Sequence, residues 1–278
     1  MRLGFHISIS GGFKNVVTRA QERQCETIQI FSRNPRGWKY KSIEPRDIEV
    51  FKKKIKEAHI EPVFIHMPYL PNLATDKKEL FKVSVASLIE ELNRAGLIGA
   101  QYVIMHIGSR GGLDEKQALA NVIKGINRAL AKVKNRKTIL LENTAGMGTE
   151  IGYRFEEIEE IIKGCNHRSR IGVVLDTAHA YEAGYDLRDH LDEVVDQFDK
   201  MVGLNFLKLV HLNDSRTRLG SRVDRHWHIG KGEIGLEGFQ RIVNQKDLKE
   251  LPGILETPRK NLEDDLMNIR TLRSLVKG

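Results

Sequence analysis

Short apolar runs recur along the whole chain, and a segment with helical periodicity follows each of them. The runs end about 25 to 45 residues apart, which is typical of repeated strand–helix units and not of a β-sandwich or a helical bundle. The predicted strands are 3–6, 27–31, 62–66, 102–106, 138–142, 171–176, 206–211 and 253–256. Eight strands, each followed by a helix, predict an α/β fold of the (β/α)8 TIM-barrel class, with an open doubly wound sheet as the alternative.

The segments between these runs carry signals for the starts and ends of helices. Pro45 precedes a helical stretch, as a first-turn proline does. Asp114 is the predicted N-cap of the helix that follows it, and Thr75 is predicted to cap a long helix that stops near Gly96. No repeat or linker divides the sequence, so residues 1–278 are expected to form a single TIM-barrel domain.

The composition of the chain limits the classes of function that it can have. The formal net charge of +8 favours a polyanionic partner, although the basic residues are spread along the chain and form only short clusters. No apolar run reaches membrane-spanning length, and the N-terminus lacks the pattern of a signal peptide. The two cysteines are far apart, which fits a reducing compartment and offers no thiolate metal site. We therefore expect a cytoplasmic protein with no membrane partner.

The ends of the predicted strands are unusually polar. Seven of the eight runs finish on a titratable residue, namely His6, His66, His106, Glu142, Asp176, His211 and Glu256. Buried parallel strands are expected to be apolar throughout, and the carboxyl ends of barrel strands meet on the face where active sites lie. Grouping these side chains without cations would be costly. His6 has no neighbouring ligand, so we interpret it as an independent polar cap.

Further candidate ligands lie just beyond the strands. His179 follows Asp176 by three residues, and Asp224 and His226 are two residues apart, a spacing that places both on one face of an extended chain. The candidate metal ligands are then His66, His106, Glu142, Asp176, His179, His211, Asp224, His226 and Glu256. Nine ligands exceed the three or four that one zinc ion takes, and they suit zinc or manganese. They predict two or three ions that share a carboxylate, an arrangement used for hydrolysis at phosphorus.

Ordered segments along nearly the whole chain resemble the endonuclease IV family of apurinic/apyrimidinic (AP) endonucleases. The matching segments are 4–8 (GFHIS), 31–38, 66–70 (HMPYL), 105–109, 141–146 (LENTAG), 176–180, 183–186, 211–235 and 255–258. The resemblance implies a TIM-type barrel with a trinuclear zinc centre. It also implies a base excision repair enzyme that cuts double-stranded DNA 5′ to abasic sites, leaving a 3′-hydroxyl and a 5′-deoxyribose phosphate, and that trims blocked 3′ ends.

The resemblance also distributes the ligands among three ions. It implies a first zinc held by His66, His106 and Glu142, a second by Glu142, Asp176, His211 and Glu256, and a third by His179, Asp224 and His226. Glu142 and Glu256 are the implied catalytic carboxylates, around a hydroxide between the first two ions. Manganese is a substitute that the same ligands allow.

For DNA contacts, the resemblance points to Arg36, Tyr69 and Leu70 as residues that enter the duplex. An abasic nucleotide lacks stacking, so flipping it out costs less and wedge residues can fill the gap. Arg225, between two candidate ligands, is a further expected phosphate contact. We expect a monomer, because the helices around a barrel can solvate their outer faces.

Two alternative functions are compatible with such a barrel. One is a metal-dependent sugar isomerase or epimerase, which needs only one or two divalent ions and so fewer ligands. The other is a DNA-damage-binding protein that has lost catalysis. All nine ligand positions are filled, which argues against such a loss.

Overall fold

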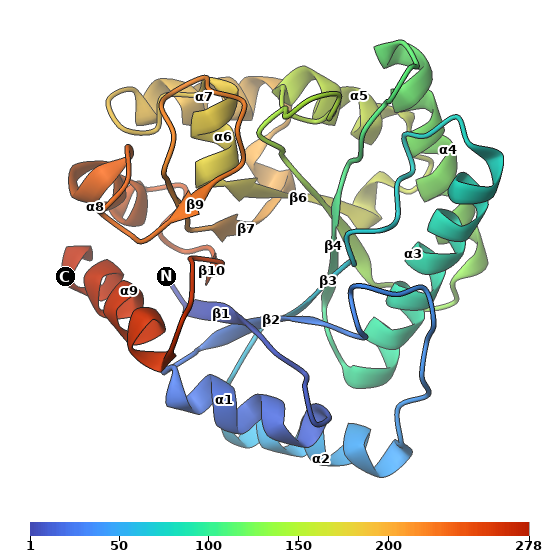
Figure 1. Ribbon diagram of the computed structural model, residues 1–278, viewed down its shortest axis with the longest axis horizontal. Coiled ribbons are helices and arrows are strands. Elements are labelled where there is room, and N and C mark those ends of the chain that lie inside the picture. Colours follow the sequence, from blue (N-terminus) through green and yellow to red (C-terminus); the bar gives the residue numbers. More distant parts are fainter. Residues whose placement is uncertain (278) are drawn as a thin grey trace.

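The structure is a computed structural model that describes residues 1–277. In this range eight parallel strands close into a barrel in the order β1-β10-β7-β6-β5-β4-β3-β2 (Figure 1). The barrel strands are β1 (Leu3–Ile7), β2 (Thr27–Phe31), β3 (Val63–His66), β4 (Tyr102–His106), β5 (Thr138–Glu142), β6 (Ile171–Asp176), β7 (Leu207–His211) and β10 (Gly253–Leu255). Because β1 pairs with both β2 and β10, the predicted (β/α)8 fold is confirmed and the open sheet is excluded.

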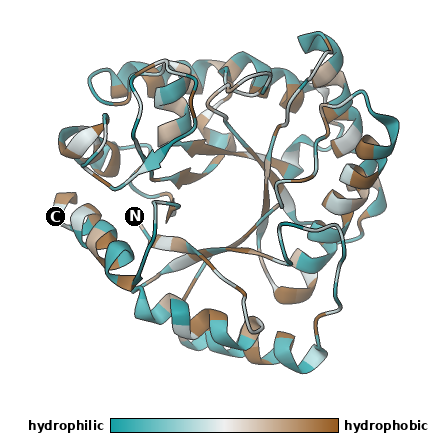
Figure 2. Cartoon of the chain, viewed as in Figure 1, coloured by the Kyte–Doolittle hydropathy of each residue, from teal (hydrophilic) through white to brown (hydrophobic). Residues whose placement is uncertain are grey.

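Helices ring the outside of the barrel, with their apolar faces against the strands and their polar faces outward (Figures 1 and 2). They are α1 (Val16–Glu22), α2 (Pro45–Glu57), α3 (Lys78–Ile98), α4 (Glu115–Lys132), α5 (Phe155–Gly164), α6 (Thr177–Ala183), α7 (Leu191–Met201), α8 (Gly235–Asn244) and α9 (Leu262–Leu275). Two predicted helix starts are confirmed: Pro45 opens α2, and the Asp114 carboxylate accepts a hydrogen bond of 2.8 Å from the Gln117 N–H in α4.

The predicted boundaries of the long helix α3 are wrong at both ends. The Thr75 hydroxyl accepts from the Lys77 N–H in a local turn, and α3 begins only after Lys77. Gly96 lies inside the helix, since the next buried apolar residue, Ile98, still belongs to its inner face. The helix stops at Gly99, which has a φ of 84° and so takes the left-handed conformation that ends helices.

Two successive layers of side chains inside the barrel lead up to the predicted ligands. The lower layer is apolar and fully buried, and it contains Phe64, Ile104, Leu140, Val174, Leu209 and Ile254. Since successive side chains of a strand alternate between faces, the residue two positions further on also points inward. Those residues are His66, His106, Glu142, Asp176, His211 and Glu256. The apolar layer is therefore a floor beneath the predicted ligands.

The connection between β7 and α8 is a long loop that folds back towards the barrel mouth (orange in Figure 1). Within it, β8 (Asp214–Ser215) and β9 (His226–Trp227) form a short antiparallel pair, with Ser215 opposite His226. This hairpin brings the candidate ligands Asp224 and His226, which are remote from any barrel strand in sequence, to the carboxyl end of the barrel.

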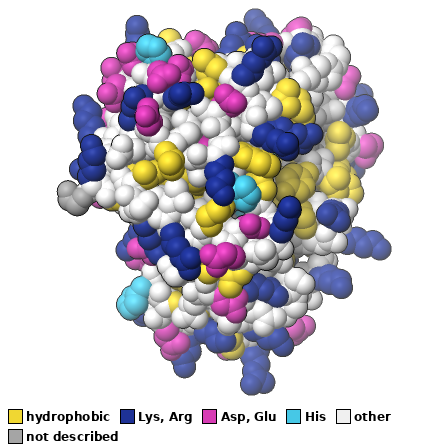
Figure 3. Space-filling view, turned by 60° about the vertical axis from the view of Figure 1, so that its left-hand side comes forward, with side chains coloured by type: hydrophobic (Ala, Val, Ile, Leu, Met, Phe, Trp, Pro, Cys, Tyr) yellow, Lys and Arg dark blue, Asp and Glu magenta, His cyan; other side chains and the backbone are white. Residues whose placement is uncertain are grey.

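The surface agrees with the dispersed charge of the sequence. Lys and Arg side chains are scattered over the face shown in Figure 3 and alternate with acidic ones. Among residues 1–277, no helix combines the length and the apolarity that crossing a bilayer requires.

Candidate metal centre

Three groups of His, Asp and Glu side chains lie at the carboxyl end of the barrel. Within each group, ligand atoms lie within 4.8 Å of one another. In the described part of the chain, the first group is His66, His106 and Glu142, the second is Glu142, Asp176, His211 and Glu256, and the third is Asp176, His179 and His226. Most members come from the ends of barrel strands, whereas His179 lies in α6 and His226 in β9.

Glu142 belongs to two of these groups. Its Oε2 atom lies 2.9 Å from His66 Nε2 and 3.3 Å from His106 Nε2. Its Oε1 atom lies 2.8 Å from His211 Nδ1. Each carboxylate oxygen therefore faces a different group of candidate ligands.

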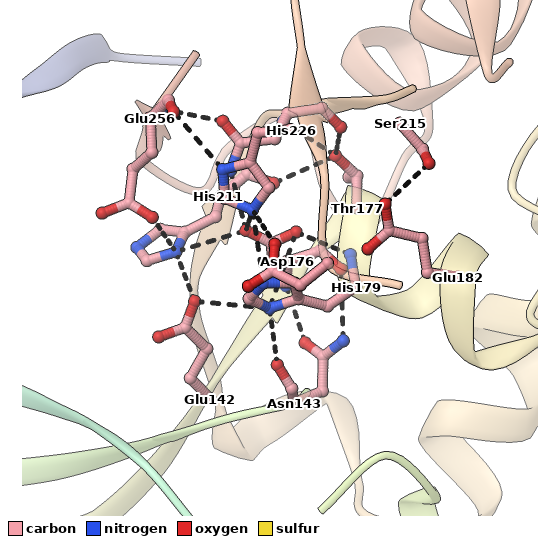
Figure 4. A network of polar contacts seen from close by, with 12 residues as sticks. Glu142, Asn143, Asp176, Thr177, His179, Glu182, His211, Ser215, His226 and Glu256 are labelled. Atoms are coloured by element: carbon pink, nitrogen blue, oxygen red, sulfur yellow. Dashed lines mark hydrogen bonds and ion pairs between the residues drawn. The ribbon is translucent and has the colours of Figure 1, made fainter. Parts of the chain in front are cut away.

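Asp176 stands between the second and third groups, and Asp224 borders the third. The Oδ2 atom of Asp176 is 3.6 Å from both His211 Nδ1 and His226 Nε2. The Oδ1 atom of Asp224 is 3.5 Å from His179 Nε2 and 3.7 Å from His226 Nε2. The structure thus gathers all nine predicted ligands. It adds a contact between Asp176 and His226 that the sequence does not reveal, and Figure 4 shows these two side chains close together.

Hydrogen bonds fix which ring nitrogen each histidine turns towards its group. His66 Nδ1 lies 2.7 Å from the carbonyl of the next residue, and His179 Nδ1 lies 2.9 Å from the Asn143 carbonyl. A carbonyl only accepts, so both Nδ1 atoms carry hydrogen, and the Nε2 atoms are the ring nitrogens that could bind a metal ion. His211 is held the other way round, because Gln29 Oε1 lies 2.8 Å from its Nε2 and leaves Nδ1 facing the carboxylates.

The geometry of the third group indicates whether these side chains suit a metal ion. His226 Nδ1 faces the Glu256 carbonyl at 3.3 Å, while His226 Nε2 faces His179 Nε2 at 3.2 Å. Both Nε2 atoms therefore direct lone pairs at each other, and they repel unless a proton or a metal ion lies between them. Two imidazoles with a neighbouring carboxylate are a ligand set that suits zinc. The residues fit a divalent metal ion.

The pKa shifts point in the same direction. Burial alone would lower the pKa of His211, but the charges of Glu142 and Glu256 hold it well above its usual value. Burial is likewise outweighed at His179, where Asp176 helps to keep the pKa well above its usual value. Burial would raise the pKa of Glu142, yet the neighbouring histidines hold it well below its usual value. Groups that attract protons this strongly also attract metal cations, which compete for the same lone pairs.

His6 lies beside the second group and outside all three. Its Nδ1 atom is 3.4 Å from Glu256 Oε1 and 2.9 Å from Gln29 Nε2. Its Nε2 atom is buried and has no hydrogen-bond partner among residues 1–277. His6 therefore lies outside the three groups, but it is not the independent polar cap that the sequence suggested, because it contacts the candidate ligand Glu256.

Two amide side chains, those of Gln29 and Asn213, orient the candidate ligands, and neither residue was predicted from the sequence. Gln29 Nε2 donates to Glu256 Oε1 at 2.5 Å, and Asn213 Nδ2 donates to Asp176 Oδ2 at 2.7 Å. Asn213 Oδ1 also accepts from the Glu256 N–H at 2.8 Å. Gln29 had a signal in the sequence: it is a lone polar residue inside an apolar run, in register with His6. Asn213 had none, because it lies in a loop.

A hollow of about 380 Å³ opens above the ligand groups, and Tyr69 and Asp224 line it together with several ligands. The Tyr69 side chain stands at its rim with 69% of its surface exposed, and its ring lies 5.4 Å from that of Phe31. Leu70 is 37% exposed, and Arg36 and Arg225 are exposed. All four predicted DNA-contacting residues are therefore accessible, and Tyr69 is the one that borders the hollow.

A closed parallel barrel with imidazole and carboxylate groups at its carboxyl end defines a TIM-barrel protein with a candidate metal site on its active-site face. Residues 17–275 match a family described as xylose isomerase-like TIM barrel. The chain is 44% identical to a protein from Cenarchaeum symbiosum (strain A) named probable endonuclease 4, and the match covers 99% of this chain and 100% of that protein.

Solved structures agree with this match. The crystal structure of endonuclease IV from Thermus thermophilus has a TM-score of 0.88 and 38% identity, and the match covers 99% of this chain and 98% of that one. The chain therefore belongs to the endonuclease IV family, a class of DNA-cleaving hydrolases, as the sequence motifs predict. A D-tagatose 3-epimerase-like protein, 18% identical with a TM-score of 0.73, covers 99% of this chain and 97% of that one, and shares the fold alone.

Proposed function

We propose that this chain is a zinc-dependent AP endonuclease. It hydrolyses the DNA phosphodiester 5′ to abasic sites, leaves a 3′-hydroxyl and a 5′-deoxyribose phosphate, and also trims blocked 3′ ends. Membership of the endonuclease IV family supports the substrate class. The observation that carries the proposal is the position of Glu142, whose two oxygens face two different ligand groups. Paired ions suit the attacking and leaving oxygens of a phosphoryl displacement.

Three zinc ions would be held by the nine side chains at the barrel mouth. The first would take His66, His106 and Glu142, the second Glu142, Asp176, His211 and Glu256, and the third His179, Asp224 and His226. Manganese suits the same nitrogen and oxygen donors. When bound, the ions supply Lewis acidity towards the phosphodiester.

The two proposed catalytic carboxylates have different surroundings. Glu142 is fully buried directly above the apolar floor, and it belongs to two of the ligand groups. Glu256 is 20% exposed and lines the hollow. Burial would raise the pKa of Glu256, but the His211 charge and a hydrogen bond from His6 hold it well below its usual value. Glu256 thus stays ionised at neutral pH and can accept a hydrogen bond from a water molecule in the hollow.

The rim residues would bind and open the DNA. Tyr69 and Leu70 present apolar surface to solvent above the hollow, which suits side chains that fill the gap left by a flipped nucleotide. Arg36 and Arg225 are exposed cations for phosphate oxygens. The net charge of +8 favours association with any duplex, so lesion preference has to come from the wedge and the hollow.

The test uses a labelled duplex that contains one stable abasic analogue. We expect incision 5′ to the analogue, loss of incision after a strong chelator has removed the metal, and its return with added zinc. The same duplex without the analogue should stay intact. Because the analogue cannot undergo elimination, a lyase would not cut it.

Metal content separates the proposal from a sugar isomerase or epimerase. Three zinc ions per chain, measured by mass spectrometry of the purified protein, are expected, whereas one or two would favour the isomerase. An intact duplex in the presence of fully metallated protein would overturn the repair function.

A further inference from the structure

The third ligand group depends on a loop that no barrel strand holds. Asp224 and His226 lie on the hairpin between β7 and α8, whereas their partner His179 lies in α6. The distances of 3.5 Å and 3.7 Å from Asp224 Oδ1 to the two imidazoles hold only while hairpin and helix stay together. Some part of the chain must fix that relation.

Glu182 makes the connection from the helix side. It lies in α6, three residues after His179, and its side chain is fully buried. Its Oε1 atom accepts from the Arg225 N–H at 3.1 Å and lies 2.8 Å from the Ser215 hydroxyl, which is drawn facing it in Figure 4. The Arg225 peptide joins the two loop ligands, so this one bond holds the backbone between Asp224 and His226.

Backbone contacts continue the same connection along the tip of the hairpin. The Gly220 N–H donates to the Tyr181 carbonyl at 3.0 Å, and the Arg222 N–H donates to the Glu182 carbonyl at 2.9 Å. Both carbonyls belong to the last turn of α6, where carbonyls lack the regular helical donors, although the Tyr181 carbonyl also accepts from the Gly184 N–H at 3.0 Å. The tip therefore caps the helix, while the Glu182 side chain reaches the root of the hairpin.

We propose that Glu182 is a positioning residue that clamps the 214–226 hairpin to α6 and so sets the geometry of the third metal group. Its role is to accept hydrogen bonds from Ser215 and the Arg225 peptide through Oε1. Burial raises the pKa of Glu182 to about 7, and Oε1 can accept these bonds in either protonation state. Its other oxygen, Oε2, is buried without a hydrogen-bond partner in the described residues, so an amide nitrogen can replace it. This proposal depends on the proposed function in one respect, because zinc is taken to be the ion that the third group binds.

The test compares two substitutions at this position. Glu182→Leu removes both acceptors, whereas Glu182→Gln keeps a carbonyl oxygen in the place of Oε1. We expect Glu182→Leu to hold two zinc ions after dialysis and to bind the third roughly 10–100-fold more weakly, the range for loss of a group that orients a ligand. Glu182→Gln should keep three ions. Zinc content after dialysis gives the number of bound ions in each variant. Titration against a chromophoric chelator gives the affinity for the third ion.

Glu157→Leu is the matched control. Glu157 is also a buried helical carboxylate, and its Oε1 accepts no hydrogen bond from residues 1–277. Its Oε2 accepts from the N–H groups of Gly152 and Arg154, both at 3.0 Å. Neither of those residues adjoins a proposed ligand. Glu157→Leu should therefore keep three zinc ions even if its melting temperature falls as far as that of Glu182→Leu.

Amide hydrogen exchange of the metal-free proteins separates the clamp from the metal. Peptides that span 216–226 should exchange faster in Glu182→Leu than in the unmodified chain or Glu182→Gln. Equal exchange in all three, or the same zinc loss in the Gln and Leu variants, would overturn the clamp. Fewer than three zinc ions in the unmodified protein would instead overturn the proposed metal centre, and exchange would still decide the clamp.

Discussion

The ligands carried by barrel strands and those carried by the 214–226 hairpin are held in different ways. Glu142, Asp176 and His211 have fully buried side chains, whereas 37% of the Asp224 side chain and 16% of the His226 side chain are exposed. Barrel register alone places the first set above the apolar floor. The second set needs hydrogen bonds to another element. Burial does not follow this division completely, since His106 ends β4 yet its side chain is 39% exposed.

This difference teaches that one site can combine a rigid and an adjustable part. Strand-borne ligands are fixed when the sheet closes, because each is two residues beyond a floor residue. Hairpin ligands are only as well placed as the contacts between the hairpin and α6. Removing Glu142, a strand-borne ligand that belongs to two groups, should therefore disturb more than one ion, and disturbing the hairpin should affect one.

The largest effect is expected from Glu142→Ala. This change removes a carboxylate that faces two groups and leaves His66 and His211 without it. Incision of the abasic duplex should fall by more than about 10³-fold, above the loss typical for a single stabilising group, and zinc content should drop by more than one ion. Glu159→Ala, on the outer surface of α5, is the control. Loss of a single ion from the Glu142→Ala protein would contradict the expected difference between strand-borne and hairpin-borne ligands.

An intermediate effect is expected from pH. The raised pKa values of His179 and His211 mean that both rings hold protons at neutral pH in metal-free protein. Zinc must displace those protons, so its affinity should weaken as the pH falls below these raised values and strengthen as the pH rises through them. Calorimetry in two buffers with different ionisation enthalpies should show proton release on zinc binding at pH 7. Heats that are independent of the buffer would contradict the direction of the shifts.

The smallest effect is expected at the rim. Tyr69→Ala should leave zinc content unchanged and weaken incision roughly 10-fold, within the 1–3 kcal/mol typical of stacking on an aromatic side chain. Leu97→Ala removes a comparably exposed apolar side chain on α3 and should have no effect. Loss of zinc from the Tyr69→Ala protein would contradict the separate roles proposed for the rim residues and the metal ligands.

Local patterns of the sequence predicted much of the fold. The eight predicted strands agree with the observed ones to within one residue at either end, because a short apolar run depends only on neighbouring residues. The stop of α3 was missed by three residues. There, two glycines compete, and packing of Ile98 against the core decides in favour of Gly99.

The candidate site was predictable where ligands end strands and unpredictable where other residues hold them. His66, His106 and Glu142 stand out as polar ends of apolar runs. Glu182 is a polar residue in a short helix, a position at which charged side chains are usually solvated. Only its burial against Ser215 and the Arg225 peptide distinguishes it.

The sequence by itself determined the barrel, the residues that face its mouth and the family, since all three depend on spacing and identity along the chain. The tertiary structure alone decided that Asp176 also faces the third group, which ring nitrogen His66, His179 and His211 present, and that α6 and the hairpin meet. Most of these contacts join residues that are more than 30 positions apart, and the closed barrel brings such distant segments to one face.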